Sequence, residues 1–190
     1  MAYVEKKKKI PNNHPHDYAD IRLYRNKKLT NSLNCRVQTI TGEKIFLLDQ
    51  FLAIGFPKVL LISFMSEWCP NCHYEALAID KIYKKFSDQD FDVVVVGEYS
   101  DAIKLGKLFD RKLHVELPYV FGEVWEKDED KKLLTTHHRI KTIVQDQRKW
   151  GVPLHIIIVD GKLDEIHLSL IHISEPTRPR LISYAVFCLK

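Results

Sequence analysis

Two cysteines separated by two residues are the side chains in this sequence best suited to covalent chemistry. Cys69 and Cys72 belong to the segment Trp68-Cys69-Pro70-Asn71-Cys72, which follows an apolar run at 59–65 and precedes a helix-like segment. In a helix, a spacing of three positions places both side chains on one face. Their Cα atoms can then fall within the range that a disulfide requires. The spacing therefore predicts a dithiol that can be oxidised and reduced.

The position of each cysteine relative to the helix predicts its role. Cys69 would lie at the helix N-terminus, where unpaired N–H groups and the helix dipole favour the thiolate. Pro70 suits the first helical position and favours an exposed helix start. Cys72 would lie one turn inside and be more buried. We therefore predict that Cys69 is the nucleophile and that Cys72 resolves the mixed disulfide.

The segments around this motif alternate between strand-like and helix-like patterns. The nearly continuous apolar run Val59–Met65 predicts a central strand covered on both faces, and residues 71–86 repeat apolar side chains at helical spacing. The remaining predicted elements are strands at 36–40, 44–48, 93–96, 154–159 and 162–166, helices at 49–53, 102–109 and 136–149, and a hairpin turn at Asp160-Gly161. This order indicates an α/β layer fold with a partly parallel sheet.

The central segment resembles a known family. The stretch 59–72, VLLISFMSEWCPNC, is similar to the active-site strand and motif of the thioredoxin superfamily. Glu75 and the preceding strand pair at 37–48 resemble the thiol–disulfide reductases of the TlpA and ResA type, and Gly151-Val152-Pro153 resembles the family's cis-proline loop. The resemblance covers about residues 36–167 and implies a thioredoxin-like, three-layer fold with a central mixed sheet.

The resemblance also implies further site residues. It implies a cis bond between Val152 and Pro153, which would bring the Val152 backbone beside Cys69 to pair with an extended substrate. Trp68 and Pro70 would shape the site.

One residue departs from the thioredoxin pattern. Thioredoxin carries a buried Asp immediately before the Phe of its central strand, where this sequence has Ser63. Glu75, one turn beyond Cys72, is a candidate proton relay in its place; the alternative is that it only caps or orients the helix.

These observations predict a thiol–disulfide oxidoreductase that uses a Cys-Pro-Asn-Cys dithiol to exchange disulfides with protein substrates. It would need no cofactor besides the redox-active Cys69–Cys72 disulfide and would bind no metal. Expected partners are protein thiols or disulfides and an upstream electron donor. With 45% hydrophobic and 28% charged residues, the chain can form an ordinary core, and a net charge of +4 is too small to indicate nucleic acid. We expect a monomer.

A metal-binding module of thioredoxin-like fold, without turnover, is the alternative. Zinc would need a second pair of ligands beside Cys69 and Cys72, and none occurs at ligand spacing; Cys35 instead suits a small buried apolar site. His14 and His16 stand without further ligands. Copper-delivery proteins of related fold separate their cysteines by three residues and add a histidine, whereas two residues separate them here.

The two ends of the sequence differ in character from the domain predicted at 31–167. Residues 1–30 are polar and predict a flexible arm. Residues 168–190 resemble a translated sequencing-library adapter of the transposase type: 168–178 (LSLIHISEPTR) and 182–189 (ISYAVFCL) match two adapter blocks, and three residues fill the place of an index. A tail of this origin carries no functional inference, Cys188 included, and predicts that the closing helix of the fold is missing.

The expected location depends on the start of the chain. The apolar region at 45–65 is interrupted by charged residues and a proline, and no apolar stretch follows Lys6–Lys9. As written, the sequence predicts a cytoplasmic protein. The resemblance implies an extracytoplasmic location if an N-terminal signal or anchor precedes this sequence.

Residues 122–135, which include Trp125, form an insertion relative to a minimal thioredoxin. This insertion is either a determinant of partner choice or a neutral surface loop.

Overall fold

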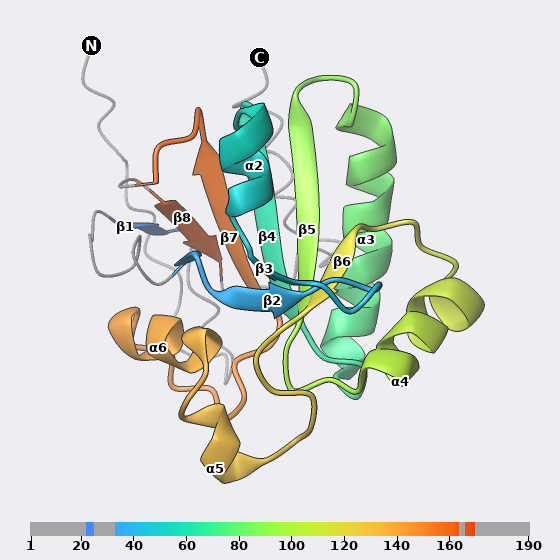
Figure 1. Ribbon diagram of the computed structural model, residues 1–190, viewed down its shortest axis with the longest axis vertical. Helices are drawn as coiled ribbons and strands as arrows, with labels where there is room; N and C mark the ends of the chain where they lie inside the picture. The colour runs from blue at the N-terminus through green and yellow to red at the C-terminus, as the bar shows by residue number, and fades with distance from the viewer. Residues whose placement is uncertain (1–21, 25–32, 164–165, 170–190) are drawn as a thin grey trace, which may run out of the picture.

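The fold is built on one mixed sheet, seen in a computed structural model that describes residues 22–24, 33–163 and 166–169 (Figure 1). The eight strands follow the spatial order β1-β8-β7-β4-β5-β6-β2-β3. Their bounds are β1 Arg22–Tyr24, β2 Arg36–Gln38, β3 Lys44–Phe46, β4 Val59–Met65, β5 Phe91–Gly97, β6 Tyr119–Phe121, β7 Leu154–Val159 and β8 Ile166–Ser169. β4, β5 and β6 run parallel, whereas the other neighbours pair antiparallel. The predicted three-layer, thioredoxin-like fold with a mixed sheet is confirmed.

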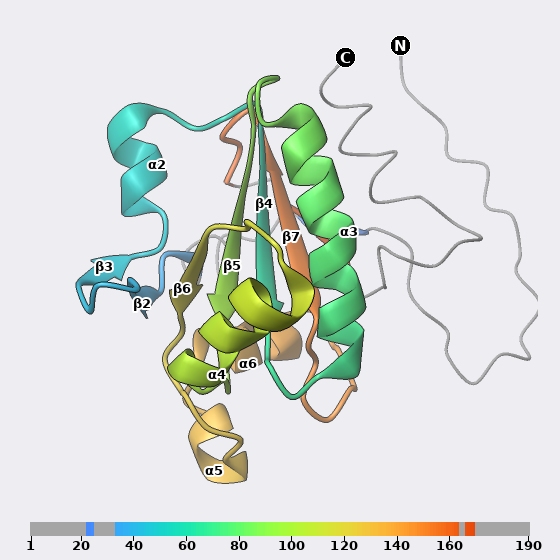
Figure 2. The same cartoon turned by 90° about the vertical axis from the view of Figure 1, so that its right-hand side faces the viewer.

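Helices cover both faces of this sheet. Figure 2 shows α3 and α2 on opposite sides of the central strands. The helices are α2 Asp49–Ile54, α3 Pro70–Phe86, α4 Ala102–Lys107, α5 Glu129–Lys132 and α6 Thr136–Ile143, and α4 continues directly into a π-helical segment at Leu108–Leu113. None of the described helices is both long enough and apolar enough to cross a membrane.

The alternation of side chains along β4 divides the core into two halves. Leu61 and Met65 pack with buried residues of α3 and α4, whereas Ile62 and Phe64 pack with α2 and α6 on the other face. All seven residues of β4 are buried. A strand with apolar neighbours on both faces is apolar at nearly every position, which is why the run at 59–65 has no polar alternation and Ser63 as its single polar residue.

Some predicted elements end elsewhere than expected. The helix predicted at 136–149 stops at Ile143, because Gln145 adopts a left-handed φ of 59° and the chain turns toward the loop at 151–153. The helix predicted at 102–109 extends to Leu113 through its π-helical part. β6 was not predicted, since three residues give too short a pattern to recognise. The hairpin turn at Asp160-Gly161 is present, with both residues at positive φ, and β7 pairs antiparallel with β8.

The predicted ends of the chain fall mostly outside the described residues. Within the predicted arm at 1–30, residues 22–24 form β1 and pair with β8, a strand that the sequence pattern did not indicate. His14 and His16 lie outside the described residues. Leu168 and Ser169 complete β8, whereas residues 170–190, with Cys188 and the place of a closing helix, are not described. The adapter origin of 168–190 stays a prediction.

Candidate functional site

The site forms where β4 ends and α3 begins. β4 delivers the chain to Trp68, and Pro70 occupies the first turn of α3, where the missing N–H of proline costs no helical hydrogen bond. Cys69 is the N-cap residue, and its sulfur accepts a hydrogen bond from the backbone N–H of Cys72 at 3.4 Å. The helix start thus holds the Cys69 sulfur against the N–H of Cys72, which also donates to the carbonyl oxygen of Cys69 at 3.0 Å.

Neither Cys69 nor Cys72 forms a disulfide in this structure, and Cys72 follows Cys69 by three positions at the start of α3. Cys69 is 6% exposed and Cys72 is 2% exposed. The sequence predicted an exposed helix start, whereas the side chain of Cys69 is buried. The aromatic side chains around the helix N-terminus and the loop at 151–153 provide this cover. Burial, followed by the hydrogen bond with Cys69, raises the pKa of Cys72 well above its usual range. Cys72 therefore needs a proton acceptor before it can act as a nucleophile.

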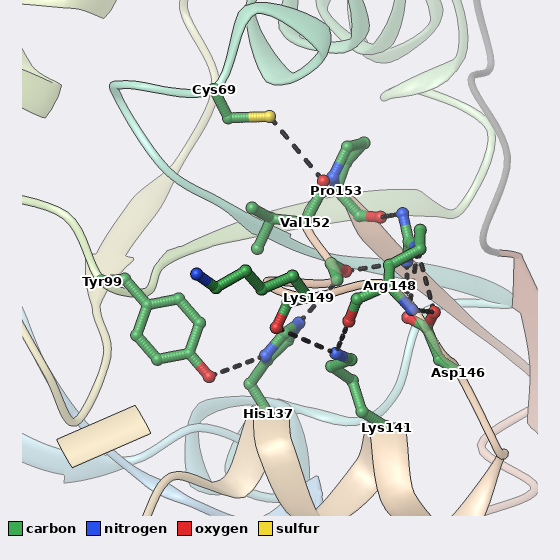
Figure 3. A network of polar contacts seen from close by, with 10 residues as sticks. Cys69, Tyr99, His137, Lys141, Asp146, Arg148, Lys149, Val152 and Pro153 are labelled. Atoms are coloured by element: carbon green, nitrogen blue, oxygen red, sulfur yellow. Dashed lines mark hydrogen bonds and ion pairs between the residues drawn. The ribbon is translucent and has the colours of Figure 1, made fainter. Parts of the chain in front are cut away.

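The loop predicted to face the dithiol does so. The Val152–Pro153 peptide bond is cis, as the resemblance implied. The sulfur of Cys69 donates to the carbonyl oxygen of Val152 at 3.7 Å (Figure 3). The loop thus brings a buried backbone segment to the predicted nucleophile from 83 positions away.

A cluster of polar side chains that sequence reasoning missed holds this loop in place (Figure 3). The guanidinium of Arg148 donates to the carbonyl oxygens of Gly151 at 2.8 Å and Pro153 at 3.0 Å, on either side of Val152. Asp146, whose side chain is 2% exposed, binds the same guanidinium at 2.8 Å. A planar guanidinium can donate to several acceptors at fixed angles, so Arg148 holds the loop through its backbone carbonyl groups.

His137 supports the same loop from α6. Its Nε2 lies 3.3 Å from the carbonyl oxygen of Gly151, and its Nδ1 lies 2.9 Å from the hydroxyl of Tyr99. A carbonyl oxygen can only accept, so Nε2 carries the proton and Nδ1 accepts from Tyr99. Burial lowers the pKa of His137 to about 3, which keeps the ring neutral. In the sequence, His137 and Arg148 fall in polar segments without a motif, so no pattern marked them.

Aromatic rings and one lysine enclose the dithiol on the side of the insertion. Trp68 donates from Nε1 to the carbonyl oxygen of Tyr99 at 2.8 Å, and its ring meets that of Trp150 edge-on with centroids 5.5 Å apart. Lys127, from the predicted insertion, lies with its ammonium 4.0 Å from the centroid of Trp68. Trp125 is 41% exposed and donates to the carbonyl oxygen of Gly122. The insertion is thus in contact with a site residue through Lys127.

A second polar group lies beneath Cys72. Glu75, on α3, is fully buried, and its Oε2 lies 3.6 Å from Nε2 of His155 on β7. Nδ1 of His155 lies 2.9 Å from the hydroxyl of Ser63 on β4. The structure therefore brings together Ser63 and Glu75, which sequence reasoning named, and adds His155, which it missed. The signal was present, because His155 is the only polar residue in the strand LHIIIV.

Cys35 lies away from this arrangement, whereas His73 directly follows Cys72 on α3. Cys35 is buried in the core on the α2 face, as predicted, and burial raises its pKa to about 12. The ring of His73 contacts the carbonyl oxygen of Glu67 at 2.6 Å. Within the described part of the chain, no three His, Cys, Asp or Glu side chains gather in a way that could hold a metal ion.

Comparisons with known proteins agree with this architecture. Residues 56–129, which include both motif cysteines, match the family described as Redoxin. DsbF of Mycobacterium tuberculosis aligns with a TM-score of 0.54 and 12% identity over 84% of this chain and 97% of that chain. The thioredoxin domain of a thiol–disulfide oxidoreductase from Bacteroides vulgatus gives 0.56 and 16% over 82% and 92%.

At this level of identity, the likeness to solved structures concerns the fold alone. A comparison with curated protein sequences found no match. The fold, the dithiol at the start of α3 and the family match nevertheless agree with one another. This chain has a thioredoxin-like fold, and its residues 56–129 match the model of the Redoxin family.

Proposed function

We propose that this protein is a thiol–disulfide oxidoreductase that acts on protein substrates through Cys69 and Cys72. One observation carries the proposal: the Cys69 sulfur lies at the N-terminus of α3 and faces the carbonyl oxygen of Val152, while Cys72 follows one turn later. A helix N-terminus stabilises a thiolate. The backbone of Val152 offers an extended substrate a partner beside the attacking sulfur.

The reaction proceeds through two exchanges. The Cys69 thiolate attacks one sulfur of a substrate disulfide, forming a mixed disulfide and releasing the other substrate sulfur as a thiolate, which takes a proton from solvent. Cys72 then gives its proton to Glu75, and its thiolate attacks the sulfur of Cys69. The substrate leaves as a second thiolate, and the Cys69–Cys72 disulfide forms. An upstream dithiol donor returns the protein to its reduced form, so no further cofactor is required.

The charge and burial around Cys72 support the role of Glu75. Cys72 is buried and its thiol is difficult to ionise, so resolution needs a nearby acceptor. Glu75 follows Cys72 by three positions on α3, and both side chains are buried on the same helix. Glu75 is the acidic residue nearest to Cys72 in the sequence, and a spacing of three positions places both side chains on one face of the helix.

Insulin reduction with dithiothreitol, combined with metal analysis of the purified protein, tests the proposal. Cys69→Ser should abolish turnover, whereas Cys72→Ser should accumulate mixed disulfides that mass spectrometry detects. Cys35→Ser is the matched control, because Cys35 lies in the other half of the core, and it should retain turnover. Full activity in both site variants would contradict the proposal. Stoichiometric metal without turnover would favour a metal-binding role instead.

A further inference from the structure

A buried histidine lies beneath the dithiol and has no part in the steps above. His155 and Ser63 are register partners across β7 and β4, on the face of the sheet that α3 covers. The neighbouring inward positions on that face, Leu61, Met65 and Ile157, are all apolar and buried. His155, Ser63 and Glu75 are each 0% exposed. Three polar side chains thus occupy positions that the rest of the face fills with hydrocarbon.

The cost of burying these groups argues against a purely structural role. Removing a polar or ionisable side chain from water is unfavourable unless it is paired, and a well-packed apolar set would fill the same space without that cost. The three side chains form one chain of contacts instead. The Ser63 hydroxyl lies 2.9 Å from Nδ1 of His155, and Nε2 of His155 lies 3.6 Å from Oε2 of Glu75.

The chemistry of the three groups gives this chain a direction. If Ser63 donates its hydroxyl proton to Nδ1 of His155, the N–H group of the ring is Nε2, which lies 3.6 Å from Oε2 of Glu75, at ion-pair rather than hydrogen-bond distance. A donor group on this side of Glu75 favours the carboxylate form, which is the form that can accept a proton. Glu75 is among the charged groups that act on Cys72. Glu75 therefore links the two groups: it lies 3.6 Å from His155 and follows Cys72 by three positions on α3.

We infer that His155, oriented by Ser63, is a positioning residue that holds Glu75 as the proton acceptor for Cys72. This inference rests on the function proposed above and concerns its second exchange alone. During that exchange the proton passes from Cys72 to Glu75, the Cys72 thiolate bonds to the sulfur of Cys69, and the substrate thiolate departs. The first exchange, in which Cys69 attacks, does not use this group. Loss of His155 should therefore slow resolution and leave attack unchanged.

The two exchanges can be followed separately with 5,5′-dithiobis(2-nitrobenzoate). Attack by Cys69 releases one thionitrobenzoate and leaves a second bound as a mixed disulfide; resolution by Cys72 releases it. The full chain carrying Cys35→Ala and Cys188→Ser limits the reaction to these two thiols. Stopped-flow absorbance gives the rate of each release, and quenched samples show the mixed disulfide by mass.

Two substitutions of His155 separate its contacts. Asparagine can replace Nδ1 toward Ser63 but does not reach Glu75, whereas glutamine can place a donor where Nε2 lies. His155→Asn should slow the second release about tenfold, the scale of one lost electrostatic contact with a carboxylate, while the first release keeps its rate. His155→Gln should resolve at close to the parent rate. Ser63→Ala, a smaller change in the same chain of contacts, should slow the second release less than His155→Asn.

A double-mutant cycle with Glu75→Gln tests whether His155 acts through Glu75. Glu75→Gln should slow resolution about a hundredfold, the scale of a lost general base. In that background, His155→Asn should add nothing. The inference is overturned if His155→Asn resolves at the parent rate, if it slows both releases equally, or if it slows resolution equally with and without the Glu75 carboxylate. A parent protein that releases no second equivalent would instead contradict the proposed function itself.

Discussion

The carbonyl oxygen of Val152 lies 3.7 Å from the sulfur of Cys69, and Arg148 binds the carbonyl oxygens of the residues on both sides of Val152. The backbone segment that faces the dithiol is therefore held by the side chain of Arg148 through the carbonyl groups of Gly151 and Pro153. This arrangement separates two tasks: Cys69 and Cys72 supply the chemistry, and Arg148 with its neighbours fixes the loop. Substitutions that leave both cysteines in place therefore test how the loop and the surroundings of the site are held and how much this contributes to stability.

Replacing Arg148 should loosen the loop at 151–153. Arg148→Met removes the donors to Gly151 and Pro153 and leaves the carboxylate of Asp146, 2% exposed, without its guanidinium partner. We expect the free energy of unfolding to fall by about 3 kcal/mol, because a buried charge then lacks its partner. Urea unfolding measures the change. Arg111→Met, at an exposed position, is the control and should change stability by less than about 0.5 kcal/mol; equal losses in the two variants would contradict the role of Arg148.

His137 should make the protein less stable in acid. The folded protein keeps this ring neutral down to a pKa of about 3, compared with 6.5 for an unperturbed histidine. Between these values the unfolded chain binds more protons, so the free energy of unfolding falls as the pH is lowered, by about 1.4 kcal/mol per pH unit. The effect is complete below the folded pKa and absent well above pH 6.5.

The test of this linkage is a difference between variants. Burial raises the pKa of Glu98 to about 8, which gives an opposite slope between its ordinary value of 4.5 and pH 8, so the curve of the parent protein combines several groups. The free energy of unfolding of His137→Gln minus that of the parent protein isolates the contribution of His137. This difference should shift in favour of the variant as the pH falls from about 6.5 toward about 4. The exposed His114→Asn serves as the control. An unchanged difference across this range would refute the assignment.

Two glycines at positive φ form a matched pair for testing the loop. Gly151 has φ of 74°, and an added Cβ would collide with the side chain of Lys141, whereas Gly55 has φ of 98° and nothing within 4 Å of the added atom. Gly55→Ala should lose about 1–2 kcal/mol for the left-handed backbone alone. Gly151→Ala should lose more, because Lys141 contacts the backbone carbonyls of Arg148 and Lys149 and resists displacement. Thermal unfolding of both variants measures the difference, and equal losses would show that the collision relaxes freely.

Lys127 should protect the ring of Trp68. Its ammonium lies 4.0 Å from the centroid of Trp68 and 5.5 Å from that of Trp150. Lys127→Met keeps an aliphatic chain over the rings but removes the charge, so we expect a loss of up to about 1 kcal/mol and stronger quenching of tryptophan fluorescence by acrylamide. Lys112→Met, an exposed control on the π-helical segment, should show neither change. If quenching is the same in both variants, the insertion does not enclose the site through Lys127.

Local patterns were sufficient where a residue's role depends on its neighbours in sequence. The start of α3 could be predicted because Pro70 and the following apolar spacing specify a helix N-terminus, which fixes Cys69 as its N-cap and Cys72 one turn later. The seven buried residues of β4 could be predicted because a strand covered on both faces is apolar at nearly every position. The burial of Cys69 could not, because it belongs to a core cluster that also takes in Val152 and Trp150 from a distant part of the chain.

The sequence by itself determined the dithiol and most of the strands and helices, since these depend on spacing along the chain, and the family resemblance indicated the loop at 151–153. The three-residue strands β1 and β6 were not predicted. Only the tertiary structure decided which side chains support these elements. His155 meets Ser63 because β7 pairs antiparallel with β4, and both meet Glu75 because α3 packs over that face of the sheet. Such contacts depend on register and packing between segments about 80–90 positions apart, and no local pattern specifies them.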